Sequence, residues 1–276
     1  MKKLIILSDW AHDSLTIQEV RSAVEGFLKD PIGVNISAVA STPSTIHTAF
    51  LKDQIVRTEE KYGRPLETVI FQNTDPRIQT KEGVEEAKGS DFIVVRLKSG
   101  IYICGPNAGY NFSIIRNKID EVYVYAGLDR GSQFRSRDLY SRVCAHLMDT
   151  MEDELDLEET HINIIPELKG HYIGHIDNFG NIKTTLTVED LKGKVEHGDE
   201  IEVTINTVKK KVLYVNNMFG AQPGKLVIYP GSSGQKDNPY LEISVWRHFT
   251  EEDTSTGVHA FNDAKPGMEI KLHLLQ

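Results

Sequence analysis

Two carboxylates follow apolar runs in this sequence and could act on a ligand. Asp9 comes directly after the run 3–8, and Asp75 follows the run 67–71 within the sequence FQNTDPR. Ligands of open α/β sheets bind at the carboxyl ends of the strands, so a carboxylate at either place can face a binding crevice. The two oxygens of Asp9 could accept both hydroxyls of a ribose diol. The alternatives are a helix cap for Asp9 and an ordinary turn for Asp75.

A glycine-flanked turn and a helix start supply further candidates. The sequence CGPNAG (104–109) places Asn107 between glycines, which would allow close approach of the backbone to a ligand or form an ordinary strand-to-helix turn. The sequence FRSRDLYSRVCAHL (134–147) opens a predicted helix with Arg135 and Ser136. A guanidinium at this place could stabilise hydroxide or bind an anion.

The most specific pattern is GHIDNFGNIKTTL, in which two strand-like segments meet at residues 178–180. Asp177, Phe179 and Asn181 cluster at the tip of this hairpin. A carboxylate, an aromatic ring and an amide together could hold an amino-acid group and stack on a base, although an asparagine-rich turn is the simpler interpretation. Three more candidates follow in the sequences PGSSG and LEISVW: Ser232, Glu242 and Val245.

The composition is that of an ordinary globular protein and excludes several classes of partner. The 276 residues are 39% hydrophobic and 26% charged, and 40 acidic against 31 basic residues give a net charge of -9. An acidic chain without a basic stripe argues against nucleic acid or an anionic membrane as partner and is compatible with a cationic substrate. The apolar runs are far shorter than the roughly 20 residues needed to span a bilayer.

Cysteine and histidine spacing predicts neither disulfides nor a metal site. Cys104 and Cys144 form no disulfide framework, so a cytoplasmic location is expected. His171 and His175 are four residues apart in a predicted strand, which separates them by roughly 13 Å, too far to share an ion.

The first part of the chain alternates predicted strands and helices, which indicates an α/β domain with a mostly parallel sheet covered on both faces. The predicted strands are 3–8, 34–40, 67–71, 92–97, 101–105 and 121–126. The predicted helices are 15–29, 44–60, 111–118 and 137–150. One antiparallel hairpin is expected to turn at 98–100.

The pattern of apolar and polar residues changes in the second part of the chain. The acidic segment 149–159 is interpreted as a solvated helix end and linker. From Gly170 onward, short alternating segments separated by turn residues predict a small antiparallel β-barrel or sandwich. These segments are HYIGHID, NIKTTLT, EIEVTI, KKVLYV, LVIYP, LEISVW and EIKLHLL. We therefore predict an α/β domain at 1–160 and a β-barrel domain at 168–276.

The order of these motifs resembles a family of enzymes that cleave S-adenosylmethionine (SAM) at its adenosyl C5′ carbon, the SAM hydrolases, or SAM hydroxide adenosyltransferases, and the SAM-dependent halogenases. The resemblance covers nearly the whole chain, and IDxFGN is its most specific motif. It implies an α/β domain joined to a small barrel, SAM as the substrate, and no cofactor. It also implies a homotrimer whose active sites lie between subunits.

The resemblance implies a role for each candidate residue. Asp9 would hold the ribose, and Asp75 would position the attacking water. Asn107 lies in the turn that the family writes PDNG or PNNG. In the barrel, Asp177, Phe179 and Asn181 would bind the methionine part and the adenine. Ser232, Glu242 and Val245 would contact the purine.

Two of the family's catalytic positions differ in this chain. Arg135 stands where the hydrolases have the His of FHGRD, and DPRIQTKE replaces the DPGVG turn with its following Arg, offering Arg77, Lys81 and Glu82 instead. Ser136 stands where halogenases have a Ser that contacts halide, but they avoid a carboxylate at the position of Asp75. Hydrolysis by water is favoured, with a halogenase, a catalytically degenerate SAM- or adenosine-binding protein, or a different nucleoside substrate as alternatives.

Overall fold

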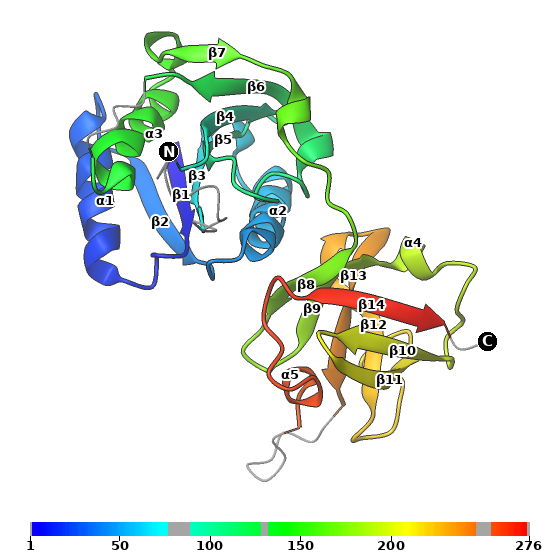
Figure 1. Cartoon of the computed structure of the whole chain (residues 1–276). Coiled ribbons are helices and arrows are strands. Elements are labelled where there is room, and N and C mark those ends of the chain that lie inside the picture. The colour runs from blue at the N-terminus through cyan, green and yellow to red at the C-terminus, as the bar shows by residue number, and fades with distance from the viewer. Residues whose placement is uncertain (1, 77–88, 128–131, 247–254, 275–276) are drawn as a thin grey trace, which may run out of the picture. The chain divides into compact units, whose positions relative to one another are not determined.

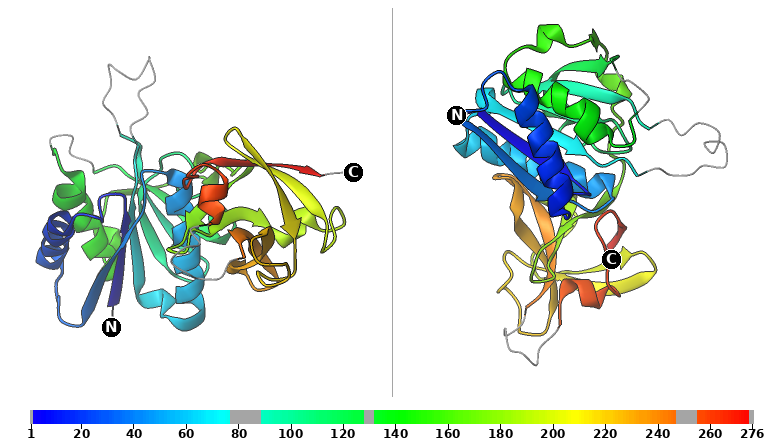
Figure 2. Two further views of the ribbon diagram at one scale, coloured as in Figure 1. Left: turned by 90° about the horizontal axis from the view of Figure 1, so that it is seen from below. Right: turned by 90° about the vertical axis from the view of Figure 1, so that its left-hand side faces the viewer.

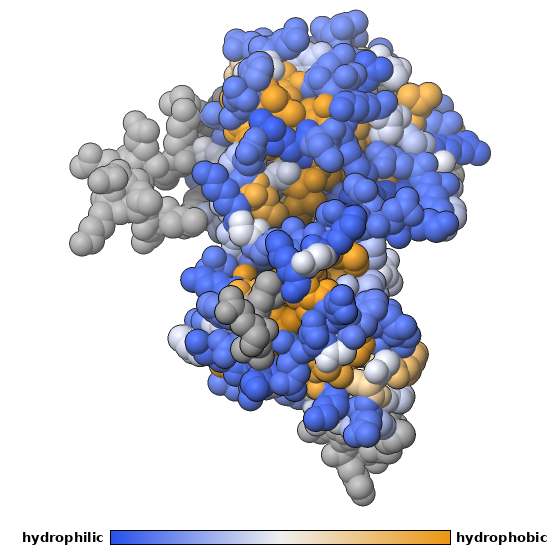
Figure 3. Space-filling view, turned by 90° about the vertical axis from the view of Figure 1, so that its right-hand side faces the viewer, coloured by the Kyte–Doolittle hydropathy of each residue, from blue (hydrophilic) through white to orange (hydrophobic). Residues whose placement is uncertain are grey.

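The chain folds into two units, residues 1–168 and 169–276. The computed structural model describes residues 2–76, 89–127, 132–246 and 255–274. On the face drawn in Figure 3, hydrophilic residues cover most of the surface, as the high content of charged residues leads one to expect. Within the described residues, no helix combines the length and the apolar character needed to cross a membrane.

The apolar runs of the first unit become neighbouring strands of one sheet (Figure 1). Among the described residues the strand order is β2-β1-β3-β5-β4-β6-β7. Strands β2, β1, β3 and β5 run parallel, whereas β4 pairs antiparallel with β5 and β6, and β6 with β7. The bounds are β1 Lys2–Ser8, β2 Val34–Ala40, β3 Thr68–Asn73, β4 Phe92–Leu97, β5 Tyr102–Pro106, β6 Ile119–Tyr125 and β7 Leu157–Glu159. The expected α/β class is confirmed, and the expected β4–β5 hairpin is joined by two further antiparallel pairings.

Helices cover both faces of this sheet (Figure 2). Helices α1 (Ser14–Phe27) and α3 (Ser141–Met148) pack with one set of alternating strand residues, among them Leu4 and Ile6. Helix α2 (Thr45–Tyr62) packs with the opposite set, among them Ile5. Strand side chains alternate between the faces, so each buried strand contributes to both cores. Short helical turns are η1 Pro65–Glu67, η2 Arg116–Lys118, η3 Ser136–Tyr140, η4 Glu152–Glu154 and η5 Ile162–Ile164.

The predicted helix at 111–118 is wrong. This stretch consists of successive turns, in which amides bond to carbonyls three residues back, and only η2 is helical. Phe112 and Ile115 are both fully buried, so their helix-like spacing reflects packing under the sheet. The side chain of Asn111 donates to the carbonyls of Thr74 and Pro106, which holds the turns against the neighbouring loops.

The acidic segment 149–159 is part of the fold, and its interpretation as a linker is wrong. Leu155 is buried in the core, and β7 forms the edge of the sheet by pairing with β6. Leu155 and Leu157 alternate with exposed acidic residues, so one face of this part packs inward. Asp149 pairs with Lys2 at 2.9 Å, and Glu152 accepts from the Tyr102 hydroxyl at 3.2 Å.

The second unit is a closed barrel with the strand order β10-β11-β12-β13-β9-β8-β14 within the described residues. All seven strand segments predicted for this part are confirmed, and so is the barrel. Neighbouring strands pair antiparallel except β11 and β12, which run parallel. The bounds are β8 His171–Ile176, β9 Ile182–Thr187, β10 Glu200–Ile205, β11 Val208–Tyr214, β12 Leu226–Gln235, β13 Asn238–Val245 and β14 Glu269–Leu274, with short helices α4 Val188–Leu191 and α5 Gly257–Ala260.

Candidate functional site

Four of the predicted site residues line one cavity in the first unit. Asp9, Asp75, Arg135 and Ser136 come from separate parts of the sequence and surround a volume of about 210 Å³. All four were predicted as site residues, whereas the other residues that line the cavity were not. The other lining residues are Trp10, Asn73, Pro106, Gln133, Phe134 and Tyr140.

The sheet topology explains why these residues meet. Asp9 directly follows β1, Asn73 ends β3 and Pro106 ends β5. Strands β1, β3 and β5 are neighbours and parallel, so their carboxyl ends lie at the same edge of the sheet. Ligands of open α/β sheets bind at this edge. Turn η3, which begins with Ser136, adds the remaining wall.

Asp9 is a half-buried carboxylate that does not serve as a helix cap. Asp13 caps α1 by accepting from the Leu15 amide, so the cap interpretation of Asp9 is wrong. Burial raises the pKa of Asp9, the nearby charge of Asp75 raises that pKa further, and a hydrogen bond from Ser8 Oγ to Oδ1 at 3.3 Å opposes the rise. The carboxylate is therefore partly desolvated, which strengthens its interaction with any donor that enters the cavity.

Asp75 is held in place by Ser90, on the far side of the segment 77–88. The Ser90 amide donates to Oδ2 at 3.1 Å and its hydroxyl donates to Oδ1 at 3.0 Å. A Cβ atom on Gly89 would lie 2.9 Å from Asp75 Oδ2 and 2.4 Å from Arg135 Nη2. The carboxylate and the guanidinium therefore approach the same glycine, which leaves space for both.

Ser136 is almost fully buried and bonded to the end of β3. Asn73 Nδ2 donates to Ser136 Oγ, and the Asn73 carbonyl accepts from Ser8 Oγ at 2.6 Å. Since Asn73 donates to this hydroxyl, Ser136 can turn its own proton toward a ligand. Ser136 begins a π-helical turn, and its carbonyl accepts from Ser141 Oγ at 2.8 Å.

Aromatic residues form part of the cavity wall. The Trp10 and Phe134 rings meet edge to face with their centroids 6.2 Å apart, and Tyr140 stacks on Phe92 at 4.2 Å. Trp10 Nε1 is buried and has no hydrogen-bond partner among the described residues. These rings offer an apolar wall, and the indole a spare donor.

Asn107 is not among the described residues that line this cavity. Asn107 Nδ2 donates to the Ile164 carbonyl at 2.8 Å. Gly105 has φ of 153°, and a Cβ atom there would lie 1.9 Å from the Gln72 carbonyl oxygen, so this glycine permits the close approach of two strands. Arg77, Lys81 and Glu82 lie outside the described residues.

The predicted hairpin tip in the barrel unit is organised by Asp177. Its Oδ1 accepts from the amides of Phe179 and Asn181 at 2.9 and 3.0 Å, and its Oδ2 accepts from Asn181 Nδ2 at 3.0 Å. Phe179 is 59% exposed. Asp177 thus holds the turn that presents Phe179 and Asn181, and both of its oxygens are engaged.

A second polar group of the barrel unit links Ser232 to Glu242. Glu242 Oε1 accepts from the Ser232 amide at 2.9 Å and from Lys183 Nζ at 2.8 Å. Lys183 Nζ also donates to Ser232 Oγ at 2.9 Å. Val245, the last of the predicted residues, ends β13 opposite Leu226. Sequence reasoning missed Lys183, although its position two residues after Asn181 lies within the hairpin motif.

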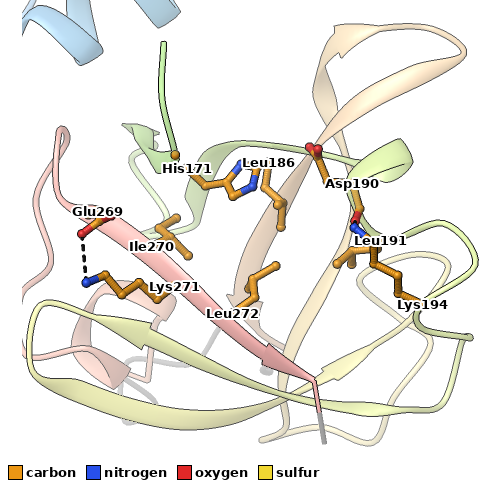
Figure 4. A pocket seen from close by; sticks show the side chains of 10 residues that line it. His171, Leu186, Asp190, Leu191, Lys194, Glu269, Ile270, Lys271 and Leu272 are labelled. Carbon is orange, nitrogen blue, oxygen red and sulfur yellow. Dashed lines mark hydrogen bonds and ion pairs between the residues drawn. The ribbon is translucent and has the colours of Figure 1, made fainter.

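The barrel unit also contains a cavity of about 390 Å³ that none of the predicted site residues line (Figure 4). Leu186, Ile270 and Leu272 contribute apolar side chains to it. Its charged groups already have partners: Glu269 pairs with Lys271 at 3.4 Å, and Asp190 accepts from Thr187 at 2.7 Å. These polar groups therefore serve the fold.

Comparisons with known proteins agree with the fold and with the barrel motifs. Residues 171–248 match the family model described as SAM hydroxide adenosyltransferase C-terminal domain. The chain is also similar to the crystal structure of an uncharacterized conserved protein from Thermotoga maritima, with a TM-score of 0.70 and 19% identity over 98% of this chain and 100% of that chain.

A conserved hypothetical protein from Thermus thermophilus is similar with a TM-score of 0.64 and 19% identity over 99% of this chain and 100% of that chain. These two likenesses show the fold alone, and no curated protein matches the chain. The model match confirms the predicted family resemblance over residues 171–248, which are similar to the SAM hydroxide adenosyltransferase C-terminal domain.

Proposed function

We propose that this chain hydrolyses SAM at the adenosyl C5′ carbon and releases adenosine and methionine. The observation that carries the proposal is the convergence of Asp9, Asp75, Arg135 and Ser136 on one cavity at the carboxyl ends of parallel strands. The family match of the barrel unit supports SAM as the ligand. The chemistry of the four side chains supports water as the nucleophile.

The reaction is an in-line displacement. A water oxygen forms a bond to C5′ while the bond from C5′ to the sulfonium sulfur breaks, and the electron pair of that bond leaves with methionine as a neutral thioether. The leaving group needs no proton, so the protein has to align the water and accept one of its protons. In this proposal Asp75 accepts that proton, because Ser90 holds its carboxylate in a fixed orientation. Asp9 accepts the two ribose hydroxyls.

The charges around the cavity favour SAM and water over a halide. Asp9 and Asp75 bring two carboxylates, and Arg135 brings one guanidinium, so these three groups carry a net negative charge when ionised. This charge attracts a cationic sulfonium and opposes a halide ion beside Asp75. Arg135 and the Ser136 hydroxyl are left to donate to the water and to the hydroxide character that it gains during attack.

The alternatives differ in their products. A protein that binds SAM without turning it over would be stabilised by SAM and would leave it intact. A halogenase would produce a 5′-halo nucleoside from SAM and chloride. The changed residues, Arg135 at the family's His position above all, make these outcomes worth separating by experiment.

The test is incubation of the purified protein with SAM, with and without chloride, followed by chromatography and a thermal-shift assay. Adenosine and methionine in equal amounts, formed at the same rate with and without chloride, are expected. A 5′-chloro product would assign a halogenase, whereas intact SAM with thermal stabilisation would assign a binding protein. Intact SAM without stabilisation would contradict SAM as the ligand.

The family resemblance also leads us to propose a homotrimer in which neighbouring subunits complete each active site. Light scattering coupled to size-exclusion chromatography should then give a mass three times that of one chain. A monomer that turns over SAM would contradict this part of the proposal.

A further inference from the structure

Lys183 lies at the centre of a charged cluster in the barrel unit. It stands on β9 opposite Glu242 on β13, and its side chain is 15% exposed. Its Nζ lies 2.8 Å from Glu242 Oε1 and 2.9 Å from Ser232 Oγ. Lys183 thus contacts two residues expected at the purine. It lies two residues after Asn181, which belongs to the hairpin tip expected at the methionine part and the adenine.

The carboxylates of this cluster are engaged within the protein. Glu242 is 5% exposed, and its Oε1 accepts from Lys183 and from the Ser232 amide, while its Oε2 accepts from the Tyr229 hydroxyl at 3.3 Å. Asp177 uses both of its oxygens to hold the hairpin turn. Neither carboxylate is therefore well placed to receive a cationic group of a ligand.

The ammonium group of Lys183 keeps donor capacity. It carries three N–H donors, and the contacts with Glu242 and Ser232 use two of them. Burial and the positive charge of Lys183 lower the pKa of the nearby His175, while the charges of Asp177 and Glu242 oppose this shift. A partly buried ammonium with a spare donor is suited to an anionic group.

We propose that Lys183 binds the carboxylate of the ligand's amino-acid group through its remaining N–H. The inference rests on the proposed function, because in SAM this carboxylate is the one anionic group. Asn181 immediately precedes β9 and Lys183 is the second residue of this strand, so both lie next to the hairpin tip and can contact the same ligand. Glu242 then has the role of a positioning residue that holds the ammonium in place.

The test compares SAM with its decarboxylated analogue, which keeps the sulfonium, the adenosine and the amine but lacks the carboxylate. Calorimetry should show that the wild-type chain binds SAM about tenfold or more tightly than the analogue, as expected for one charge-assisted hydrogen bond. In Lys183→Gln this preference should fall to near onefold, through weaker binding of SAM alone. Lys183→Arg should keep the preference, since it keeps the charge.

Controls separate this effect from a loss of folding. Lys183→Gln leaves the buried Glu242 carboxylate without its cation, so the double variant Lys183→Gln/Glu242→Gln removes both charges and should also show no preference. Lys192→Gln changes an exposed lysine of the same unit and should keep the wild-type preference. An unchanged preference in both Lys183→Gln and the double variant would overturn the inference while leaving SAM hydrolysis intact. A wild-type chain that binds neither ligand would overturn the inference and the proposed function together.

Discussion

Asp75 Oδ2 and Arg135 Nη2 approach the same point in space, the place that a Cβ atom on Gly89 would occupy, at 2.9 and 2.4 Å. The two side chains come from positions 60 residues apart, and both reach this point because residue 89 has no side chain to fill it. Asp9 lines the same cavity as these two residues, and the nearby charge of Asp75 adds to burial in raising the pKa of Asp9. The carboxylate of Asp75 and the guanidinium of Arg135 therefore both depend on the space that Gly89 leaves.

A methyl group at residue 89 should therefore damage the site and spare the fold. In Gly89→Ala the added Cβ displaces the ends of two flexible side chains, so we expect turnover to fall by about tenfold or more, with the thermal midpoint nearly unchanged. Gly26→Ala is the matched control, since a Cβ there meets no atom within 4 Å. Wild-type turnover in Gly89→Ala would show that the Asp75–Arg135 arrangement does not matter to the reaction.

Removal of the Asp75 charge should slow turnover strongly without preventing the binding of SAM. In Asp75→Asn the side chain still accepts from Ser90 but cannot take the proton of the attacking water, so we expect kcat to fall by roughly 10²–10⁴-fold. Calorimetry should still detect SAM, and Asp153→Asn, at an exposed acid of the same unit, should behave like the wild type. Full activity of Asp75→Asn would remove Asp75 from the mechanism.

Ionisation of Asp9 should lower the stability of the fold and strengthen the binding of the ligand. The pKa of Asp9 is raised above 3.8, chiefly by burial, so its ionised form costs stability, and that cost appears as pH rises through the raised pKa. Asp9→Asn should raise the thermal midpoint at neutral pH by about 2 °C and lose this advantage in acid, where Asp9 is protonated.

Binding should show the reverse dependence on the ionisation of Asp9. The ionised carboxylate accepts the ribose hydroxyls, so the affinity of the wild type for SAM should fall as the pH is lowered and Asp9 is protonated. Because the pKa of Asp9 is raised, this fall should begin at a higher pH than for an ordinary aspartate, whose pKa is about 3.9. Asp9→Asn should bind SAM about tenfold more weakly at neutral pH and lack this acid limb. A wild-type affinity that is flat between pH 7 and pH 4 would argue against ribose recognition by Asp9.

Lys52 should make the stability of the first unit rise with pH. Its amine is fully buried above the Phe112 ring, 3.7 Å from the centroid, without a hydrogen-bond partner among the described residues. Burial holds the pKa of Lys52 well below 10.5, so between the two pKa values the unfolded chain binds more protons and stability increases with pH.

The measurement is urea denaturation at pH 7 and pH 9.5. At pH 7, Lys52→Met should be more stable than the wild type by on the order of 1 kcal/mol. It should also lack the increase in the free energy of unfolding that Lys52 causes between the two pH values. Lys61→Met changes an exposed lysine of the same helix and should keep that rise. A Lys52→Met variant with the wild-type pH dependence would show that Lys52 does not cause it.

Periodic patterns in the sequence were sufficient for most elements. The strands 34–40 and 92–97 were predicted with their observed bounds, and all seven barrel strands were located, because alternation and apolar runs are local properties. The same reasoning failed at 111–118, where Phe112 and Ile115 have helical spacing but pack from successive turns. It also failed at β7, whose short alternation lies within a strongly acidic segment.

Residue types and local motifs were enough to predict Asp9, Asp75, Arg135 and Ser136 as candidates for the chemistry. Their position around one cavity follows from the fold, because strand order and pairing depend on contacts between distant segments. The partners that orient them, Ser90 at Asp75 and Asn73 at Ser136, carry no motif of their own. Asn73 and Ser136 are 63 residues apart, and a hydrogen bond over that separation exists only once β3 and η3 are packed in the folded unit.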